Sequence, residues 1–364
     1  MRRVTVLIFH APARGPGSRE EVFERARAAL AEHHRAAFLA TGAATATIVA
    51  EPPDQEPFGV RLRRAVREHV PAGAGLIVLG SGAMPLIGAA DRRRFLDVAA
   101  GAAGHALANN RFSCDALAVA NAAILSRLPP VRGDNELPRW LADEAGIEVE
   151  DLSGHWRPQV DLDSPLDIVL AARDRTCPHP LRVLAEAIVN EPARAAFRAA
   201  QTNVDRVMAD GQGELVVVGR TSARTLRWLE LNARCRVRAL VEERGMRTAG
   251  EANRRPPRSV LGRLLDLDAD GPAGLARSMA ELGDAAIVDT RILLAHRLGA
   301  EEAAWPVPED RFASDLLEPD AIADPWLRDL TRSAVTGGLP ILLGGHSLVG
   351  PGVRLLGRGP RAQA

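Results

Sequence analysis

Lysine and tyrosine are absent from the sequence. Every basic side chain among the 364 residues is an arginine or one of nine histidines, so no reaction of this protein can use a lysine ammonium. Basic and acidic residues number 46 each, so the formal net charge is zero and no overall field attracts nucleic acid or a membrane surface. We therefore expect neither nucleic acid nor a membrane as a partner.

Cysteine is rare, and long apolar runs are missing. The three cysteines, Cys114, Cys177 and Cys235, lie far apart and have neither a CxxC motif nor zinc-site spacing. The apolar run at residues 4–9 stops at His10, which is too early for a signal peptide or a membrane span. These features predict a cytoplasmic protein in a reducing compartment.

The apolar runs that are present predict an α/β protein. Short buried-strand patterns at residues 4–9, 45–50 and 76–79 alternate with helix-like stretches, and a second alternation begins at residues 214–218. We expect a mostly parallel, doubly wound sheet of the GT-A or Rossmann-like kind, followed by a second α/β domain. The predicted divisions are a first domain at 1–175, a helical connector at 176–212 and a second domain at 213–364.

Three motifs follow one another in the first half. A glycine-rich loop with arginines occupies residues 14–19, and a Gly-Ser-Gly-Ala-Met-Pro-Leu-Ile turn occupies residues 80–87. The segment Val-Asp-Leu-Asp-Ser-Pro-Leu-Asp-Ile follows at residues 160–168. This order resembles nucleotidyltransferases of the GT-A-like fold, in particular the molybdenum-cofactor and 2-phospho-lactate guanylyltransferases, over residues 4–172.

The resemblance implies a nucleotide site in the first half. It implies that the first loop wraps the nucleotide phosphates and that Arg19 acts there as a catalytic cation. Asp161 is implied as a catalytic residue, and Asp161 and Asp163 as ligands of a magnesium ion. The nucleotide-binding residues implied by this loop are Arg14, Gly15, Gly17 and Ser18.

Two departures from the family pattern keep a second interpretation open. Ala83 stands where the family has a metal-binding aspartate, and the loop lysine of the family is absent. The first hypothesis is transfer of a nucleotidyl group from an NTP to a small phosphorylated or carboxylated acceptor. The alternative is a degenerate, non-catalytic nucleotide-binding or scaffolding domain fused to an anion-binding α/β domain.

Structural explanations compete with these assignments. The loop at residues 15–17 is also typical of an ordinary strand–helix turn. Ser164 and Pro165 are also the residues expected at the N-cap and first position of a helix. In the resembled family the polar tract between the second and third motifs helps to bind the acceptor, which implies Asn110, Asp134 and Asn135; an exposed turn is the alternative there.

Residues of the second half are selected by position alone. Ligands of open α/β sheets bind beyond the carboxyl ends of the strands, so the residues that follow each predicted strand are candidates. We expect an anion site there with His346 as an acid–base group. The alternatives are that Ser222 caps a helix, Asp289 and Arg291 form an ion pair, and His346 lies in a turn. The candidate anion-binding residues are Arg220, Ser222, Glu242, Asp289 and Arg291.

Overall fold

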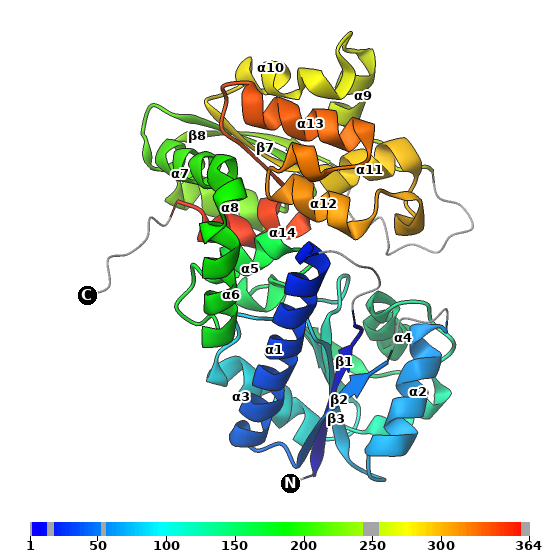
Figure 1. The fold of residues 1–364 in the computed structure, drawn as a ribbon. Helices are drawn as coiled ribbons and strands as arrows, with labels where there is room; N and C mark the ends of the chain where they lie inside the picture. The colour runs from blue at the N-terminus through cyan, green and yellow to red at the C-terminus, as the bar shows by residue number, and fades with distance from the viewer. Residues whose placement is uncertain (1, 13–17, 52–55, 243–254, 358–364) are drawn as a thin grey trace. The chain divides into compact units, whose positions relative to one another are not determined.

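The computed structural model describes residues 2–12, 18–51, 56–242 and 255–357. Its helices and strands form two compact units (Figure 1). Unit 1 comprises residues 1–16, 24–162 and 176–181, and unit 2 comprises residues 17–23, 163–175 and 182–364. The α/β class expected from the sequence is confirmed, and each unit is built on its own sheet.

Unit 1 contains a six-stranded sheet in the order β2-β1-β3-β5-β4-β6. Only β5 runs against the other five strands, so the sheet is mixed, although mostly parallel. The strands are β1 (Val4–His10), β2 (Thr45–Ala50), β3 (Gly75–Gly80), β4 (His105–Ala108), β5 (Ala116–Val119) and β6 (Glu148–Asp151). The helices are α1 (Ser18–Thr41), α2 (Phe58–His69), α3 (Ala89–Ala100) and α4 (Leu137–Asp143).

Alternating strand residues feed two separate cores in unit 1. Val6 and Ile8 of β1 pack with residues of α1 and α3, whereas Leu7 packs with residues of α2 and α4. Side chains of successive strand residues point to opposite faces, so a strand that is apolar throughout is buried on both. Figure 1 shows α1 and α3 on one side of the β1–β3 region and α2 and α4 on the other.

Unit 2 contains a fully parallel four-stranded sheet in the order β10-β9-β7-β8. The strands are β7 (Glu214–Gly219), β8 (Arg236–Val241), β9 (Ala285–Asp289) and β10 (Ile341–Gly344). Helix α7 packs along β7, β9 and β10. The helices are α5 (Pro165–Ala171), α6 (His179–Asn190), α7 (Ala195–Ala209), α8 (Ala223–Asn232), α9 (Val260–Leu267), α10 (Leu275–Ala280), α11 (Thr290–Leu298), α12 (Pro308–Asp315), α13 (Pro325–Thr336) and α14 (His346–Val349).

The division of the chain differs from the one expected at residue 175. It falls after Leu162, because α5 belongs with the second sheet: a Cβ atom added to Gly344, at the end of β10, would lie 2.7 Å from Leu166 Cδ2. Helix α7 covers that sheet rather than connecting two domains. No helix among the described residues is long and apolar enough to cross a membrane.

Gly219, the last residue of β7, provides the first testable prediction. Its φ of +144° is rare for L residues, and an added Cβ would lie 2.3 Å from Asp289 Cβ. We expect Gly219→Ala to reduce the free energy of unfolding by about 2 kcal/mol or more, measured by urea denaturation. Gly211→Ala is the control, since nothing lies within 4 Å of a Cβ there; equal losses in both variants would contradict the packing argument.

Candidate functional site

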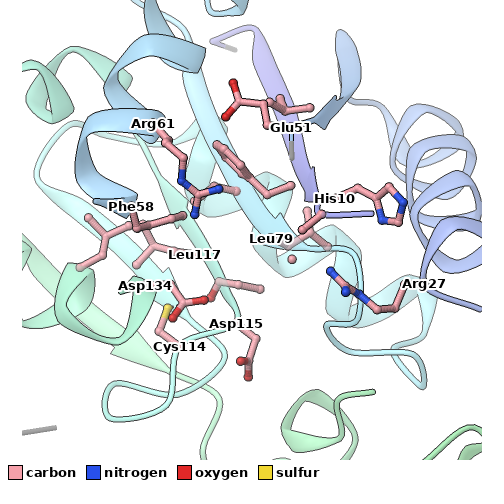
Figure 2. Close-up of a pocket in the computed structure, with 17 residues that line it drawn as sticks. His10, Arg27, Glu51, Phe58, Arg61, Leu79, Cys114, Asp115, Leu117 and Asp134 are labelled. Carbon is pink, nitrogen blue, oxygen red and sulfur yellow. The ribbon is translucent and has the colours of Figure 1, made fainter. Parts of the chain in front are cut away.

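A cavity of about 180 Å³ opens at the carboxyl edge of the unit 1 sheet. From β1 the chain passes to β2 on one side and then crosses to β3 on the other, so the strand order reverses between β1 and β3. Ligands of open α/β sheets bind at such a reversal. His10, the last residue of β1, lines this cavity (Figure 2), and so does Gly80, the last residue of β3.

Two aromatic rings and a guanidinium form one side of the cavity. Phe9 and Phe58 meet edge to face with ring centroids 5.7 Å apart. The guanidinium carbon of Arg61 lies 6.0 Å from the centre of the Phe58 ring. Arg61 is half-buried, and its Nε is buried without a hydrogen-bond partner in the described part of the chain. A half-buried guanidinium without a carboxylate partner is suited to bind an anion.

A hydrogen-bonded chain forms the opposite side. His10 Nδ1 lies 3.0 Å from Ser81 Oγ, and His10 Nε2 lies 3.1 Å from Glu24 Oε1. Arg27 Nε donates to the same Ser81 hydroxyl over 3.2 Å. Ser81 is fully buried and its hydroxyl contacts both His10 and Arg27, so it orients these two neighbours. The chain holds His10 and Arg27 at the cavity wall (Figure 2).

The carboxylates of the cavity are partly used by the protein. Glu51 accepts two hydrogen bonds from Arg64, and Asp115 accepts one from Asn109. Asp134, expected to bind the acceptor, does line the cavity. Asn135 supports the wall, since its Oδ1 accepts from the Cys114 backbone N–H.

Asn110, also expected to bind the acceptor, shapes its own loop. Its Oδ1 accepts from the N–H groups of Phe112 and Ser113, and its Nδ2 donates to Gln159.

The second and third sequence motifs meet in unit 1. Ala83 and Asp161 form an antiparallel β-bridge, and the Leu162 N–H donates to the Gly82 carbonyl. His34 Nε2, from α1, donates to the Ala83 carbonyl over 2.8 Å and so anchors the turn that contains Ala83. Burial lowers the pKa of His34 to about 3, so its imidazole is neutral.

The expected magnesium ligands fall on either side of the unit boundary. Asp161 is half-buried in unit 1, whereas Asp163 is exposed in unit 2. No group of three or more His, Cys, Asp or Glu side chains among the described residues is arranged to hold a metal ion. Mg²⁺ commonly takes one or two carboxylates and completes its shell with water and substrate phosphates.

The predicted phosphate loop is only partly described. Arg14, Gly15 and Gly17 lie outside the described residues, and Ser18 is the exposed first residue of α1.

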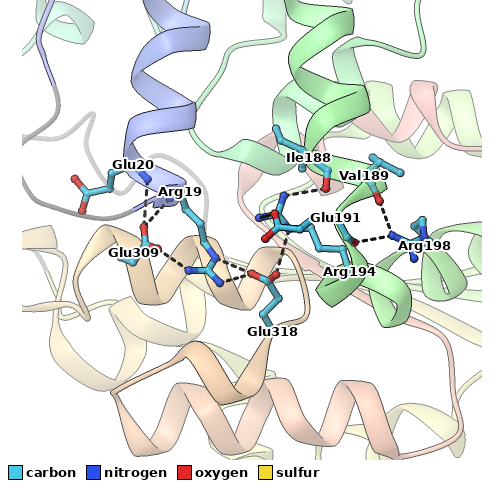
Figure 3. Close-up of polar contacts among 9 residues, drawn as sticks. All are labelled: Arg19, Glu20, Ile188, Val189, Glu191, Arg194, Arg198, Glu309 and Glu318. Carbon is cyan, nitrogen blue, oxygen red and sulfur yellow. Dashed lines mark hydrogen bonds and ion pairs between the residues drawn. The ribbon is translucent and has the colours of Figure 1, made fainter.

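Arg19, predicted as a catalytic cation, is held by two carboxylates of unit 2 (Figure 3). Its guanidinium donates to Glu309 over 2.5 Å and to Glu318 over 2.6 Å. Glu309 also accepts from the backbone N–H groups of Arg19 and Glu20, and Glu318 accepts from Arg194. These contacts make Arg19 a structural residue of unit 2 and give its phosphate role no support.

Four of the residues predicted in the second half converge at the carboxyl edge of unit 2. Arg220 donates to both Asp289 oxygens, from Nε over 2.6 Å and from Nη2 over 3.1 Å. Burial raises the pKa of Asp289, but Arg220, His346 and Arg291 outweigh it and hold that pKa below its ordinary value. The edge therefore gathers Arg220, Asp289, Arg291 and His346, as the strand-end rule predicts.

Arg291 is not available to a ligand, because it forms a buried bidentate pair. Nη1 and Nη2 donate to the two oxygens of Asp315 over 2.5 and 2.6 Å. The expected partner Asp289 accepts instead from the Arg291 backbone N–H, as the N-cap of α11. Burial raises the pKa of Asp315 despite this guanidinium.

The other predicted residues serve helix termini. Ser222 is the N-cap of α8, as the structural alternative held. Glu242, which suited a ribose by its position, accepts from Ser259 Oγ and from the N–H groups of Val260 and Leu261 at the start of α9. His346 begins the short helix α14.

Ser164 is the N-cap residue of α5, and Pro165 holds the first helical position, as the structural alternative predicted. The Ser164 hydroxyl donates to Asp167 Oδ2 rather than capping the helix.

Sequence reasoning missed most of the unit 1 cavity. His10 directly follows an apolar run, Glu51 follows the second run, and Phe58 and Arg61 begin the next helix. The strand-end rule was used only for the second half of the sequence. Applied to the first half as well, it would have selected His10 and Glu51. Nothing in the sequence indicates that Arg61 has no ion-pair partner among the described residues.

No protein-family model, curated protein or solved structure matches the chain.

Asp167 provides a prediction of pH dependence. It is buried, its Oδ1 has no hydrogen-bond partner among the described residues, and burial with Asp163 and Asp315 nearby raises its pKa to about 8. Between pH 4 and 8 the unfolded chain loses this proton while the folded chain keeps it, so folding stability falls as pH rises. Asp167→Asn removes this cost, which is at most about 5 kcal/mol at pH 8.

The measurement is the urea unfolding free energy of both proteins at pH 5 and pH 8. The advantage of Asp167→Asn over the parent should grow with pH. Asp320→Asn is the matched control for loss of a surface carboxylate, because the Asp320 side chain is 92% exposed where it pairs with Arg332. A difference between Asp167→Asn and the parent that does not change with pH would mean that the Asp167 carboxyl ionises normally.

Proposed function

We propose that unit 1 binds a nucleotide in the cavity at the carboxyl ends of β1 and β3 and transfers its nucleotidyl group to a small phosphorylated or carboxylated acceptor. Arg61 is the observation that carries this proposal. It is a half-buried guanidinium at the cavity wall that has no ion-pair partner among the described residues and lies against the Phe58 ring. A ligand with both an aromatic ring and an anionic group complements this wall.

The size of the cavity fits part of a nucleotide. A volume of about 180 Å³ is below the range of roughly 300–1,000 Å³ that encloses whole drug-sized ligands. The proposal therefore places the base against Phe9 and Phe58 and leaves the phosphates and the acceptor at the mouth.

In the proposed reaction an acceptor oxygen attacks the α-phosphorus and the bond to the bridging oxygen breaks, releasing pyrophosphate. Arg27 and Arg61 would offset the phosphate charge, and both reach the cavity from helices packed on the sheet. A magnesium ion bound with the nucleotide would supply further charge neutralisation; the resemblance implies Asp161 as its carboxylate, although Asp161 is not among the residues that line the cavity.

A non-catalytic nucleotide-binding domain is the second candidate, and Ala83 favours it. Ala83 pairs with Asp161 in a β-bridge, so a carboxylate at residue 83 would lie beside that of Asp161, and Ala83 has a methyl group instead. With one carboxylate, metal affinity depends more on the phosphates than in a two-carboxylate site.

Arg61→Gln tests the binding site. Loss of a charge-assisted contact predicts nucleotide affinity at least tenfold weaker, measured by calorimetry with each NTP in the presence of Mg²⁺. Arg67→Gln, an exposed position on the same helix, is the matched control and should bind like the parent. Equal affinity in both variants would place the nucleotide elsewhere. Pyrophosphate release with phosphorylated or carboxylated acceptors then separates the enzyme from the non-catalytic binder.

Ala83→Asp tests the alignment with Asp161. A second carboxylate beside Asp161 should make nucleotide binding more dependent on Mg²⁺ and raise affinity in its presence several-fold. Ala83→Asn has nearly the same size without the charge and controls for steric effects at this buried position. The same Mg²⁺ dependence in the two variants would show that residue 83 is not beside the metal.

A further inference from the structure

The loop between β7 and α8 carries polar groups that have no hydrogen-bond partner among the described residues. From β7 the chain passes to β8 on one side and then crosses back to β9 on the other, so this loop lies at the strand-order reversal of the second sheet. Thr221 in this loop is fully buried, and its Oγ1 has no hydrogen-bond partner within the described part of the chain. A buried hydroxyl without a partner destabilises the fold unless something else accepts or donates there.

Arg220, the preceding residue, has a guanidinium whose orientation is fixed and whose hydrogen-bond donors are not all used. Asp289 binds Nε and Nη2, which sets the orientation of the planar group. Nη1 has no partner among the described residues, and the side chain is 18% exposed. Gly219 lets the loop approach Asp289 this closely, because a Cβ there would collide with it.

The N-terminus of α8 adds a positive potential at the same place. The helix has 10 residues and no acidic residue in its first turn, where Arg224 is exposed. The helix dipole already puts partial positive charge at this end, so an arginine in the first turn is unfavourable unless an anion is near. The Ser222 hydroxyl accepts from the Thr225 N–H at the start of α8. The N–H groups of the preceding helix residues remain for other acceptors.

We propose that unit 2 binds an anion, of the phosphate or carboxylate class, between Arg220, Thr221 and the first turn of α8. The Thr221 hydroxyl and Arg220 Nη1 donate to it, and the helix terminus and Arg224 supply the potential. Arg291 takes no part, because Asp315 binds it at both terminal nitrogens. This site belongs to unit 2 and does not depend on the nucleotide cavity of unit 1.

The experiment titrates the full chain with inorganic phosphate and, in a second arm, with acetate, by calorimetry and thermal unfolding. Tighter binding of one probe assigns the class. Thr221→Val has nearly the same shape without the hydroxyl and should bind about tenfold more weakly. Its unfolding temperature without ligand should equal or exceed that of the parent, because an unpaired buried hydroxyl is gone. A purely structural role for this hydroxyl would not move affinity and stability in opposite directions.

Arg224→Gln provides a second variant that leaves the buried loop intact, with affinity expected to fall several-fold. Arg227→Gln, also exposed on α8, is the matched control and should bind like the parent. The proposal is overturned if the parent binds neither probe at millimolar concentration. It is equally overturned if Thr221→Val and Arg224→Gln bind as tightly as the parent, because the anion then lies elsewhere.

Discussion

The carboxylate of Asp289 organises the carboxyl edge of the unit 2 sheet. It is fully buried at the end of β9, where it binds the Arg220 guanidinium and begins α11 by accepting the Arg291 N–H. One side chain thus joins the ends of the two central strands. Removing either member of a buried ion pair typically costs roughly 3–5 kcal/mol, because the remaining charge has no partner. The orientation of Arg220, and with it the neighbouring loop, depends on this pair.

The same strand-order rule leads to different chemistry in the two units. In unit 1 the reversal between β1 and β3 opens into a cavity, with Arg61 left without a carboxylate partner among the described residues. In unit 2 the reversal between β7 and β9 is filled by the pairs Arg220–Asp289 and Arg291–Asp315. A guanidinium without a carboxylate partner can offer all its donors to a ligand, whereas Asp289 binds two nitrogens of Arg220 and leaves Nη1. The two units are therefore proposed to bind ligands through different parts of the edge.

Local sequence patterns predicted the strands and helices well, but they did not predict contacts between residues far apart in the sequence. Buried strands at residues 4–9 and 214–218 were recognisable because each is apolar throughout, and the strand-end rule brought Arg220 and Asp289 together. Contacts between residues far apart in the sequence were not recognisable. Arg19 matched a phosphate loop by its neighbours, yet its partner Glu309 lies 290 positions away. The compact units divide after Leu162 and not at residue 175, since the packing of α5 depends on β10.

The absence of lysine gives these ion pairs a common geometry. A guanidinium binds a carboxylate through two parallel hydrogen bonds, as Arg291 does with Asp315, whereas an ammonium is a point charge without a preferred plane. The pairs Arg291–Asp315 and Arg220–Asp289 therefore fix an orientation as well as a charge. Arg220 shows the consequence: two of its nitrogens are bound by Asp289, and the direction of the third is set. A structural pair can thus position a donor for a ligand, which a lysine at the same place would not do.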